Sequence, residues 1–330
     1  MPSGEFSPGM YAARIVRAVL KDVDDLLDQV LEAGADRRPT AGITAFDEWA
    51  RTHKHSEFYL AVFRQSMDDV ERLLRTCVDM AESIAVLMET NGPSFVSPLV
   101  LSRSLGEAVM RVCHVIAADV PPQRTLARMA AFQLEAVEGN LRAAQMFGAQ
   151  AAAEGARALD NIAEMQDWLK REGFELGPHR VKPFTAWIKV DGQTENIEFN
   201  ATDAYKRYMP MGVWHWNLGS GVTHSRGWML PSVAGAGDDA PLSSLVELFI
   251  TVTDVVLELG DALARAGAAH TALDVDWFHK KNHLRRRGML SLAKRNNDIA
   301  VDHREYAARG PDWVYSETRL GDAFLKRRRK

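Results

Sequence analysis

Apolar residues recur along most of this chain at the three- and four-residue spacing that is typical of amphipathic helices. The pattern predicts helices over 8–33, 56–90, 97–119, 242–268 and 275–296, with Ser56 as a cap for the second of them. A short helix is expected around 46–49. After Pro121-Pro122, a helix rich in Ala, Leu and Met is expected to continue to Arg171, with a break near Gly148.

The segment 185–199 lacks the helical spacing of apolar residues and predicts a β-hairpin. Two short strand-like stretches flank Asp191-Gly192, and an Asp-Gly pair is typical of a two-residue hairpin turn. Asn200 or Thr202 is expected to cap the helix that follows. The pattern as a whole predicts a mostly α fold: one helical domain over 1–330, a multi-helix bundle with a single small hairpin insert, and a basic C-terminal region over 279–330.

Composition supports a folded protein with an ample core, since 46% of its 330 residues are hydrophobic and 25% are charged. No run of about 18 uncharged apolar residues occurs, so no membrane span is expected. The first residues lack the basic and apolar regions of a signal peptide, and a cytoplasmic location is therefore expected. Cys77 and Cys113 lie in apolar helical patterns and are expected to be buried, reduced thiols.

The net charge of −4 conceals a basic end on an acidic body. Residues 279–330 contain fifteen Lys and Arg against six Asp and Glu, a surplus of nine, so the other residues carry −13. Such a cluster is a candidate contact for RNA. The alternatives are a solvated helix face, or docking on acidic residues of the same chain or of a partner subunit. The predicted RNA-binding residues are Lys280, Lys281, Arg285, Arg286, Arg287, Arg327 and Arg328.

The segment 208–228 gathers histidine, tryptophan, serine, tyrosine and arginine around a proline and four glycines, a mixture that indicates a site. Ser220 and His224 share a face if the segment is helical, and a histidine beside a hydroxyl and an arginine can transfer protons or hold a phosphate. The alternative is a histidine that only fixes helix packing. The predicted catalytic residues are Tyr208, His215, Ser220, His224 and Arg226, with substrate contacts from Arg103, Glu107, Arg207, Trp214, Trp216 and Trp228.

Arg103 and Glu107 are four residues apart in a helix with many apolar positions. This spacing favours a structural ion pair, because a buried charge needs a partner. The alternative is that the pair lines the same pocket as His224 and orients it. In that case the segment must break between Met209 and Gly212, because twelve residues of unbroken helix would separate Tyr208 from Ser220 by about 18 Å.

Several of these motifs together resemble a set of helical proteins common in actinobacteria, which are similar in turn to the HEPN-like superfamily. The resemblance rests on 102–108 (Ser-Arg-Ser-Leu-Gly-Glu-Ala), Arg124, Arg128, Tyr208 and 220–224. It implies a helical fold and RNA cleavage without a metal, by an Arg-x(4–6)-His motif. Arg207 and His215 have seven intervening residues, so they match that motif only if Pro210 distorts the helix.

Two patterns in the sequence are typical of metal binding. Asp24, Asp25 and Asp28 fit the Asp-Asp-x-x-Asp pattern of class I isoprenoid enzymes, which holds magnesium and diphosphate. That motif comes unusually early in the chain, and the second metal motif, near 297–305, has Val301 in place of a ligand. His279 and His283 have zinc-ligand spacing but lie among cations. No metal and no cofactor is therefore expected.

The leading hypothesis is an RNA-directed enzyme with a Tyr/Ser/His/Arg pocket, such as a HEPN-like ribonuclease. The alternatives are an aminoacyl-tRNA-dependent acyl transferase, a class I isoprenoid enzyme, and a non-enzymatic helical binding module. The sequence is also compatible with a homodimer. The hypothesis expects His224 to face a cavity with Arg103 or Glu107 on its opposite wall.

Overall fold

The computed structural model describes residues 8–36, 38–90, 96–144, 146, 148–180, 184–223 and 242–297. Within these ranges the fold is mostly helical with one small antiparallel sheet, which confirms the predicted fold class. None of the helices in these ranges combines the length and the apolar character that a membrane span requires. The α-helices are α1 (Pro8–Ala35), α2 (Gly42–Thr52), α3 (Ser56–Glu89), α4 (Val96–Ile116), α5 (Pro122–Ala144), α6 (Ala151–Arg171), α7 (Ala201–Tyr208), α8 (Val213–Thr223), α10 (Leu242–Thr271) and α11 (Asp276–Asn297).

Two short 3-10 turns interrupt the helices: η1 (Gly148–Gln150) and η2 (Pro210–Gly212). The first confirms the predicted break near Gly148. The predicted cap at Ser56 is wrong, because Ser56 is the first residue of α3 and His55 occupies the cap position without a side-chain hydrogen bond. Asn200 does cap α7, and its side-chain oxygen accepts a hydrogen bond from the Asp203 backbone N at 3.1 Å.

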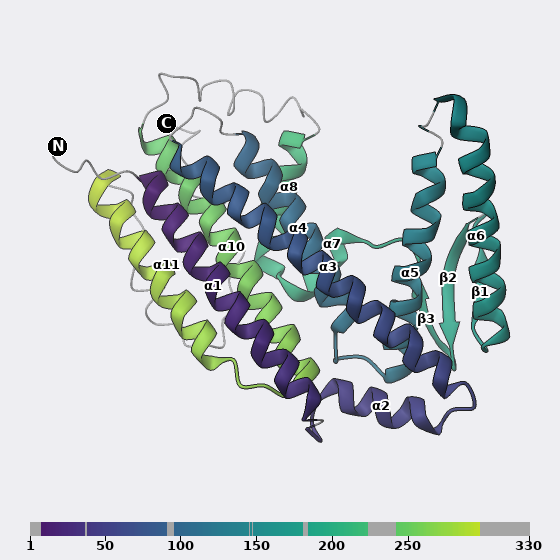
Figure 1. The fold of residues 1–330 in the computed structure, drawn as a ribbon. Coiled ribbons are helices and arrows are strands. Elements are labelled where there is room, and N and C mark those ends of the chain that lie inside the picture. Colours follow the sequence, from purple (N-terminus) through teal and green to yellow (C-terminus); the bar gives the residue numbers. More distant parts are fainter. Residues whose placement is uncertain are drawn as a thin grey trace.

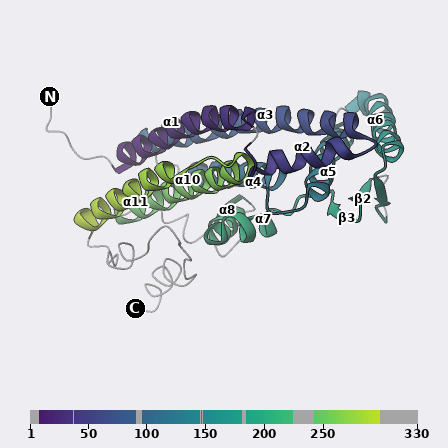
Figure 2. The same ribbon diagram turned by 90° about the horizontal axis from the view of Figure 1, so that it is seen from below.

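The long helices lie in layers. Figure 1 shows α1, α3, α10 and α11 running roughly alongside one another, with α6 and the sheet beyond the α2 end of α3. Figure 2 places α1 and α3 in one layer, α10 and α11 in the next, and α7 and α8 on the far side of these. Helix α4 contacts α3, α5, α7, α8 and α10. It is therefore the element on which the shorter helices are positioned.

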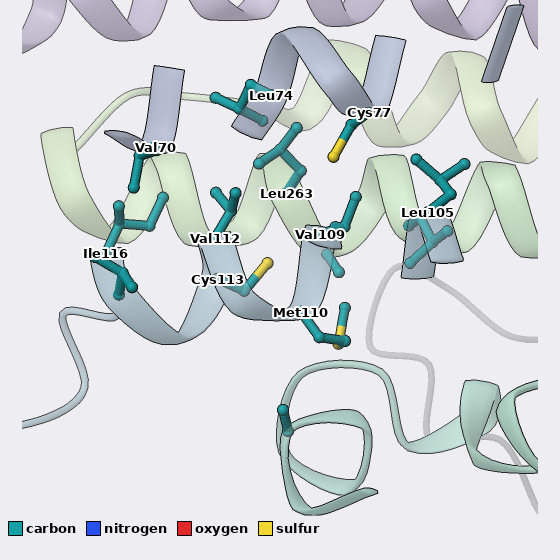
Figure 3. Close-up of a cluster of buried hydrophobic side chains, with 14 of the residues drawn as sticks. Val70, Leu74, Cys77, Leu105, Val109, Met110, Val112, Cys113, Ile116 and Leu263 are labelled. Carbon is teal, nitrogen blue, oxygen red and sulfur yellow. The ribbon is translucent and has the colours of Figure 1, made fainter. Parts of the chain in front are cut away.

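Part of the core fills the space between α3, α4 and α10. Figure 3 shows side chains from the three helices meeting there, among them Leu74, Val112 and Leu263. Cys77 and Cys113 belong to the same core; both are buried and neither forms a disulfide, as predicted. Burial raises the pKa of both thiols to about 12, so they are protonated and unreactive at neutral pH.

The sheet consists of β1 (Glu175–Pro178), β2 (Thr185–Val190) and β3 (Gln193–Asn196) in the order β1-β2-β3, all antiparallel. The hairpin of β2 and β3 confirms the prediction. Asp191 and Gly192 have φ of 43° and 81°, the left-handed pair that a two-residue hairpin turn needs. Strand β1 was not predicted. Ile188 and Val190 are buried, and the sheet packs on α5 and α6.

Candidate functional site

The predicted site segment is broken where expected. Helix α7 ends at Tyr208, Met209 leaves helical geometry with φ −147°, and α8 starts at Val213 after the turn η2. The predicted break between Met209 and Gly212 is thus confirmed. His224, Arg226 and Trp228 lie outside the described residues, as does the side chain of Trp214. The placement of His224 opposite Arg103 or Glu107 therefore stays a prediction.

Two glycines let the broken segment approach α4. A Cβ at Gly219 of α8 would lie 2.8 Å from the Arg103 Cβ, closer than two carbons can pack. A Cβ at Gly106 of α4 would lie 1.6 Å from the hydroxyl of Tyr205, a fully buried side chain of α7. The end of α8, which carries the half-buried Ser220, therefore rests against the Arg103 turn of α4.

Three of the predicted substrate contacts meet at this place. Arg103 Nη2 lies 2.8 Å from Glu107 Oε1, and Trp216 Nε1 donates to the same oxygen at 3.2 Å. The Arg103 guanidinium also lies 5.7 Å from the Trp216 ring centroid. The predicted ion pair is confirmed, and it supports α8 as well as α4.

Two predicted catalytic residues, His215 and Tyr208, do not belong to the cluster of Arg103, Glu107 and Trp216. His215 is buried, and burial lowers its pKa to about 3, so its ring is neutral at pH 7. Tyr208 contacts α4 at His114, with ring centroids 6.4 Å apart. His114 is eleven residues from Arg103, which is about 16 Å along a helix. The structure therefore does not bring Tyr208 and Ser220 together in one pocket.

A cavity of about 230 Å³ opens instead between α4, α5, α7 and the chain around β3. Four arginines line it, and we call it the arginine cavity. The lining residues on which its chemistry depends are Arg111, His114, Arg124, Arg128, Phe132, Glu135, Glu195, Glu198, Phe199, Asp203 and Arg207.

The buried Glu195 carboxylate marks the base of the cavity. Its Oε2 lies 3.0 Å from Arg124 Nε and 3.1 Å from Arg128 Nε, and its Oε1 lies 3.6 Å from His114 Nε2. Burial would raise the pKa of Glu195, but the surrounding His114, Arg124 and Arg128 groups lower it to about 2. Glu195 is therefore ionised at every physiological pH.

Arg128 is the most enclosed of the four arginines, since its side chain is 0% exposed. Its Nη1 donates to the His114 carbonyl oxygen at 3.4 Å. Its Nη2 is buried and has no hydrogen-bond partner among the described residues. A buried guanidinium N–H without an acceptor destabilises the fold, so an acceptor that reached this donor would be stabilised by it.

The other walls combine aromatic rings with neutralised charges. Arg111 pairs with Glu135, and its guanidinium lies 4.5 Å from the Phe199 ring centroid and 6.0 Å from that of Phe132. The ring of His114 also contacts Phe199, at 5.7 Å between centroids. Burial lowers the pKa of His114, although Glu195 opposes this shift, and the imidazole is neutral at pH 7. These side chains are held in place before any ligand arrives.

Exposed side chains line the open side of the cavity. Glu198, Asp203 and Arg207 are all exposed there. Arg207 Nη2 lies 2.6 Å from Asp119 Oδ2, outside the cavity lining, so its charge is already neutralised. The predicted substrate contact Arg207 thus reaches the cavity, although not the pocket for which it was proposed.

Sequence reasoning missed Arg111, His114 and Glu195. A signal for the first two exists, because Arg103, Glu107, Arg111 and His114 follow one another at spacings of four, four and three residues. Such residues form a single polar stripe on one helix face. Arg124 and Arg128 entered only through the HEPN-like resemblance. Glu195 carries no comparable signal, since one acidic residue in a hairpin is ordinary.

In the described part of the basic region, residues 279–297, three of the predicted RNA contacts pair with acids of the same chain. Lys281 Nζ lies 2.7 Å from Asp22 Oδ1, Arg285 pairs with the same carboxylate, and the buried Arg286 pairs with Asp254. These three predicted RNA contacts therefore have acidic partners on α1 and α10. Lys280 and Arg287 are exposed, whereas Arg327 and Arg328 lie outside the described residues.

Further acids of α10 complete this interface. Asp261 Oδ1 lies 2.9 Å from His279 Nδ1 and accepts a hydrogen bond from Asn282 Nδ2 at 3.0 Å. Glu258 is also buried, and burial together with the charge of Asp254 raises its pKa to about 8. Its Oε2 is buried without a hydrogen-bond partner in the described part of the chain. Glu258 therefore holds a proton at neutral pH.

The acidic motif considered for an isoprenoid enzyme is solvent-facing. Asp24, Asp25 and Asp28 are exposed on α1. Within the described ranges, no three His, Cys, Asp or Glu side chains are grouped so as to hold a metal ion.

Comparison with known proteins adds no relative: no protein-family model, no curated protein and no solved structure matches this chain. Functional conclusions therefore depend on the geometry of the described residues.

Proposed function

We propose that this protein recognises a small ligand whose phosphate or carboxylate group enters the arginine cavity. The observation that carries the proposal is the base of the cavity, where Arg124 and Arg128 share the single carboxylate of Glu195. Two positive charges against one negative charge leave a surplus of one. Arg128 Nη2 adds a buried donor that finds no acceptor in the described residues. An anionic ligand would neutralise this surplus, and guanidinium groups match phosphate and carboxylate oxygens well.

The volume of the cavity limits the size of the ligand. A volume of about 230 Å³ lies below the roughly 300–1,000 Å³ of pockets that hold drug-sized molecules. The ligand is therefore a small metabolite, or the terminal group of a larger molecule whose remainder stays outside. Phe132 and Phe199 supply apolar wall on either side of Arg111, so the carbon skeleton of such a ligand has surface to contact.

Isothermal titration with inorganic phosphate and with acetate, at low ionic strength, tests this proposal. We expect heat of binding from at least one anion. Arg124→Gln should weaken that binding about tenfold or more, because it removes a charged hydrogen-bond donor whose side chain is 38% exposed. The matched control Arg72→Gln alters an exposed arginine of α3 and should bind like the wild type. Absence of binding, or equal binding by Arg124→Gln, would contradict the proposal.

A second candidate function is RNA-directed chemistry at the end of α8. The packing of Gly219 on Arg103 supports it, because this contact brings Ser220 beside an arginine that is paired with Glu107 and Trp216. A HEPN-like ribonuclease, or an acyl transferase that uses charged tRNA, would place its reacting groups there. The exposed Lys280 and Arg287 would then contact RNA phosphates. Such a protein would act in the cytoplasm, as a monomer or a homodimer.

Total tRNA incubated with the protein in chelator-containing buffer separates this candidate from a plain binding module. Cleavage that His224→Ala abolishes, with an unchanged melting temperature, is the expected result for a ribonuclease. RNA affinity should fall steeply with salt, and deletion of 324–330 should make that dependence shallower. Intact RNA together with salt-independent binding would exclude RNA as the substrate.

A further inference from the structure

The charges of the arginine cavity are segregated between its base and its open side. At the base, the buried Glu195 pairs with the enclosed Arg128 and with Arg124, whose side chain is 38% exposed, and these groups together carry one surplus positive charge. The open side carries Glu198 and Asp203, both exposed. Elsewhere in the lining, the charges of Arg111 and Glu135 cancel.

The negative charge at the open side is poorly neutralised. Glu198 forms no ion pair with any described residue. Asp203 lies 3.5 Å from Lys206, but both side chains are about two-thirds exposed, at 68% and 64%. Exposed pairs of this kind are weak and exchange readily with other cations. Arg207, an exposed cation of the lining, is already paired with Asp119.

We infer that the ligand of the arginine cavity is a zwitterion, whose anionic group binds Arg124 and Arg128 while its ammonium group binds Glu198 and Asp203. This inference rests on the proposed function and adds the second charge. A ligand that carried only an anion would use the base alone, and the exposed acids Glu198 and Asp203 would contribute nothing to its binding. A ligand with an ammonium group a few bonds away satisfies both ends at once.

The volume fits such a molecule. At ~30 Å³ for each water-sized group, 230 Å³ accommodates roughly eight non-hydrogen atoms. An amino acid with a short chain, or a phosphate ester of a small amino alcohol, has this size. The two classes share the same pattern of charges and differ only in the anionic group.

Matched pairs of probes test the inference by isothermal titration. Phosphoethanolamine and ethyl phosphate differ in the ammonium group alone, and β-alanine and propionate form the corresponding carboxylate pair. We expect the zwitterion of the better-binding pair to bind about two- to fivefold more tightly, the range of an exposed ion pair. Glu198→Gln should reduce that preference, because the ammonium group loses a charged partner that the anion-only probe never used. The control Asp25→Asn, an exposed acid of α1, should keep the preference.

The outcomes are distinct. If the zwitterion and its anion-only partner bind equally in both pairs, the inference is overturned while the proposed anion site stands. An unchanged preference in Glu198→Gln also overturns the inference, because the ammonium group would then bind elsewhere. If none of the four probes binds, the proposed function itself fails.

Discussion

Replacing Glu258 by Gln should stabilise this protein at neutral and alkaline pH. Glu258 is buried on α10, with Asp254 and Asp261 on the same helix and Arg286 facing it from α11. Burial, reinforced by the charge of Asp254, raises its pKa from 4.5 to about 8. Gln has the same shape as the protonated carboxyl group and never ionises.

The size of the effect follows from the two pKa values. Between pH 4.5 and pH 8 the unfolded chain has lost the Glu258 proton while the folded chain retains it, so the folded state loses stability as the pH rises. At pH 7 the pH lies about 2.5 units above the pKa of Glu258 in the unfolded chain. At 1.36 kcal/mol per unit, this lowers the free energy of unfolding by about 3 kcal/mol. Gln removes this loss, and its benefit should therefore vanish near pH 4.5 and be largest above pH 8.

Urea unfolding at pH 5, 7 and 8 measures this benefit directly. The matched control is Glu164→Gln, which removes an exposed carboxylate of α6 and should leave the pH dependence unchanged. A Glu258→Gln protein that is no more stable than the wild type at pH 8, or that loses stability with pH just as steeply, would refute the reasoning. It would mean that Glu258 is ionised in the folded protein and neutralised by Arg286.

Three further predictions concern the core and the cavity. Gly106→Ala should destabilise the protein by about 1–3 kcal/mol in urea unfolding, since its methyl group meets the Tyr205 hydroxyl; an unchanged midpoint would contradict the packing of α7 on α4. Glu195→Gln should cost about 3–5 kcal/mol at pH 7, because two arginines lose their carboxylate. The stabilisation by Glu195 should fade as the pH falls from 4.5 towards 2, and a variant of wild-type stability would exclude this role. Cys77 and Cys113 should resist a thiol reagent in the native state and react on unfolding; rapid native labelling would show that the core opens.

Helices and turns could be predicted because their causes are local. The turn at Pro210 and Gly212 separates α8 from α7, and both residue types already predict a helix break from the sequence. The hairpin follows from Asp191-Gly192, which tolerates the left-handed backbone that the turn requires. Strand β1 has no local sequence signal, because its four residues do not alternate in burial. They are extended because they pair with β2.

The cavity could not be predicted because its partners are distant in the chain. Glu195 is 67 residues from Arg128 and 71 from Arg124, and nothing near any of the three shows that they meet. The same reason explains Arg286. In the sequence it belongs to a basic cluster suited to RNA, whereas in the fold it is a buried partner of Asp254. Charge patterns in the sequence indicate which residues need partners, whereas the tertiary structure determines which residues those partners are.

The docking of α11 on α1 has a consequence for the order of events during synthesis. Lys281 and Asp22 are 259 residues apart, so this contact cannot form until nearly the whole described chain has left the ribosome. At about 5–20 residues per second, the interval is on the order of 13–50 s. During that time α1 can pair with α3, whose Glu82 and Glu89 bind Arg17, but its surface for α10 and α11 stays open. The nascent protein therefore spends most of this interval as a half-covered intermediate, until α10 and α11 cover the open face of α1.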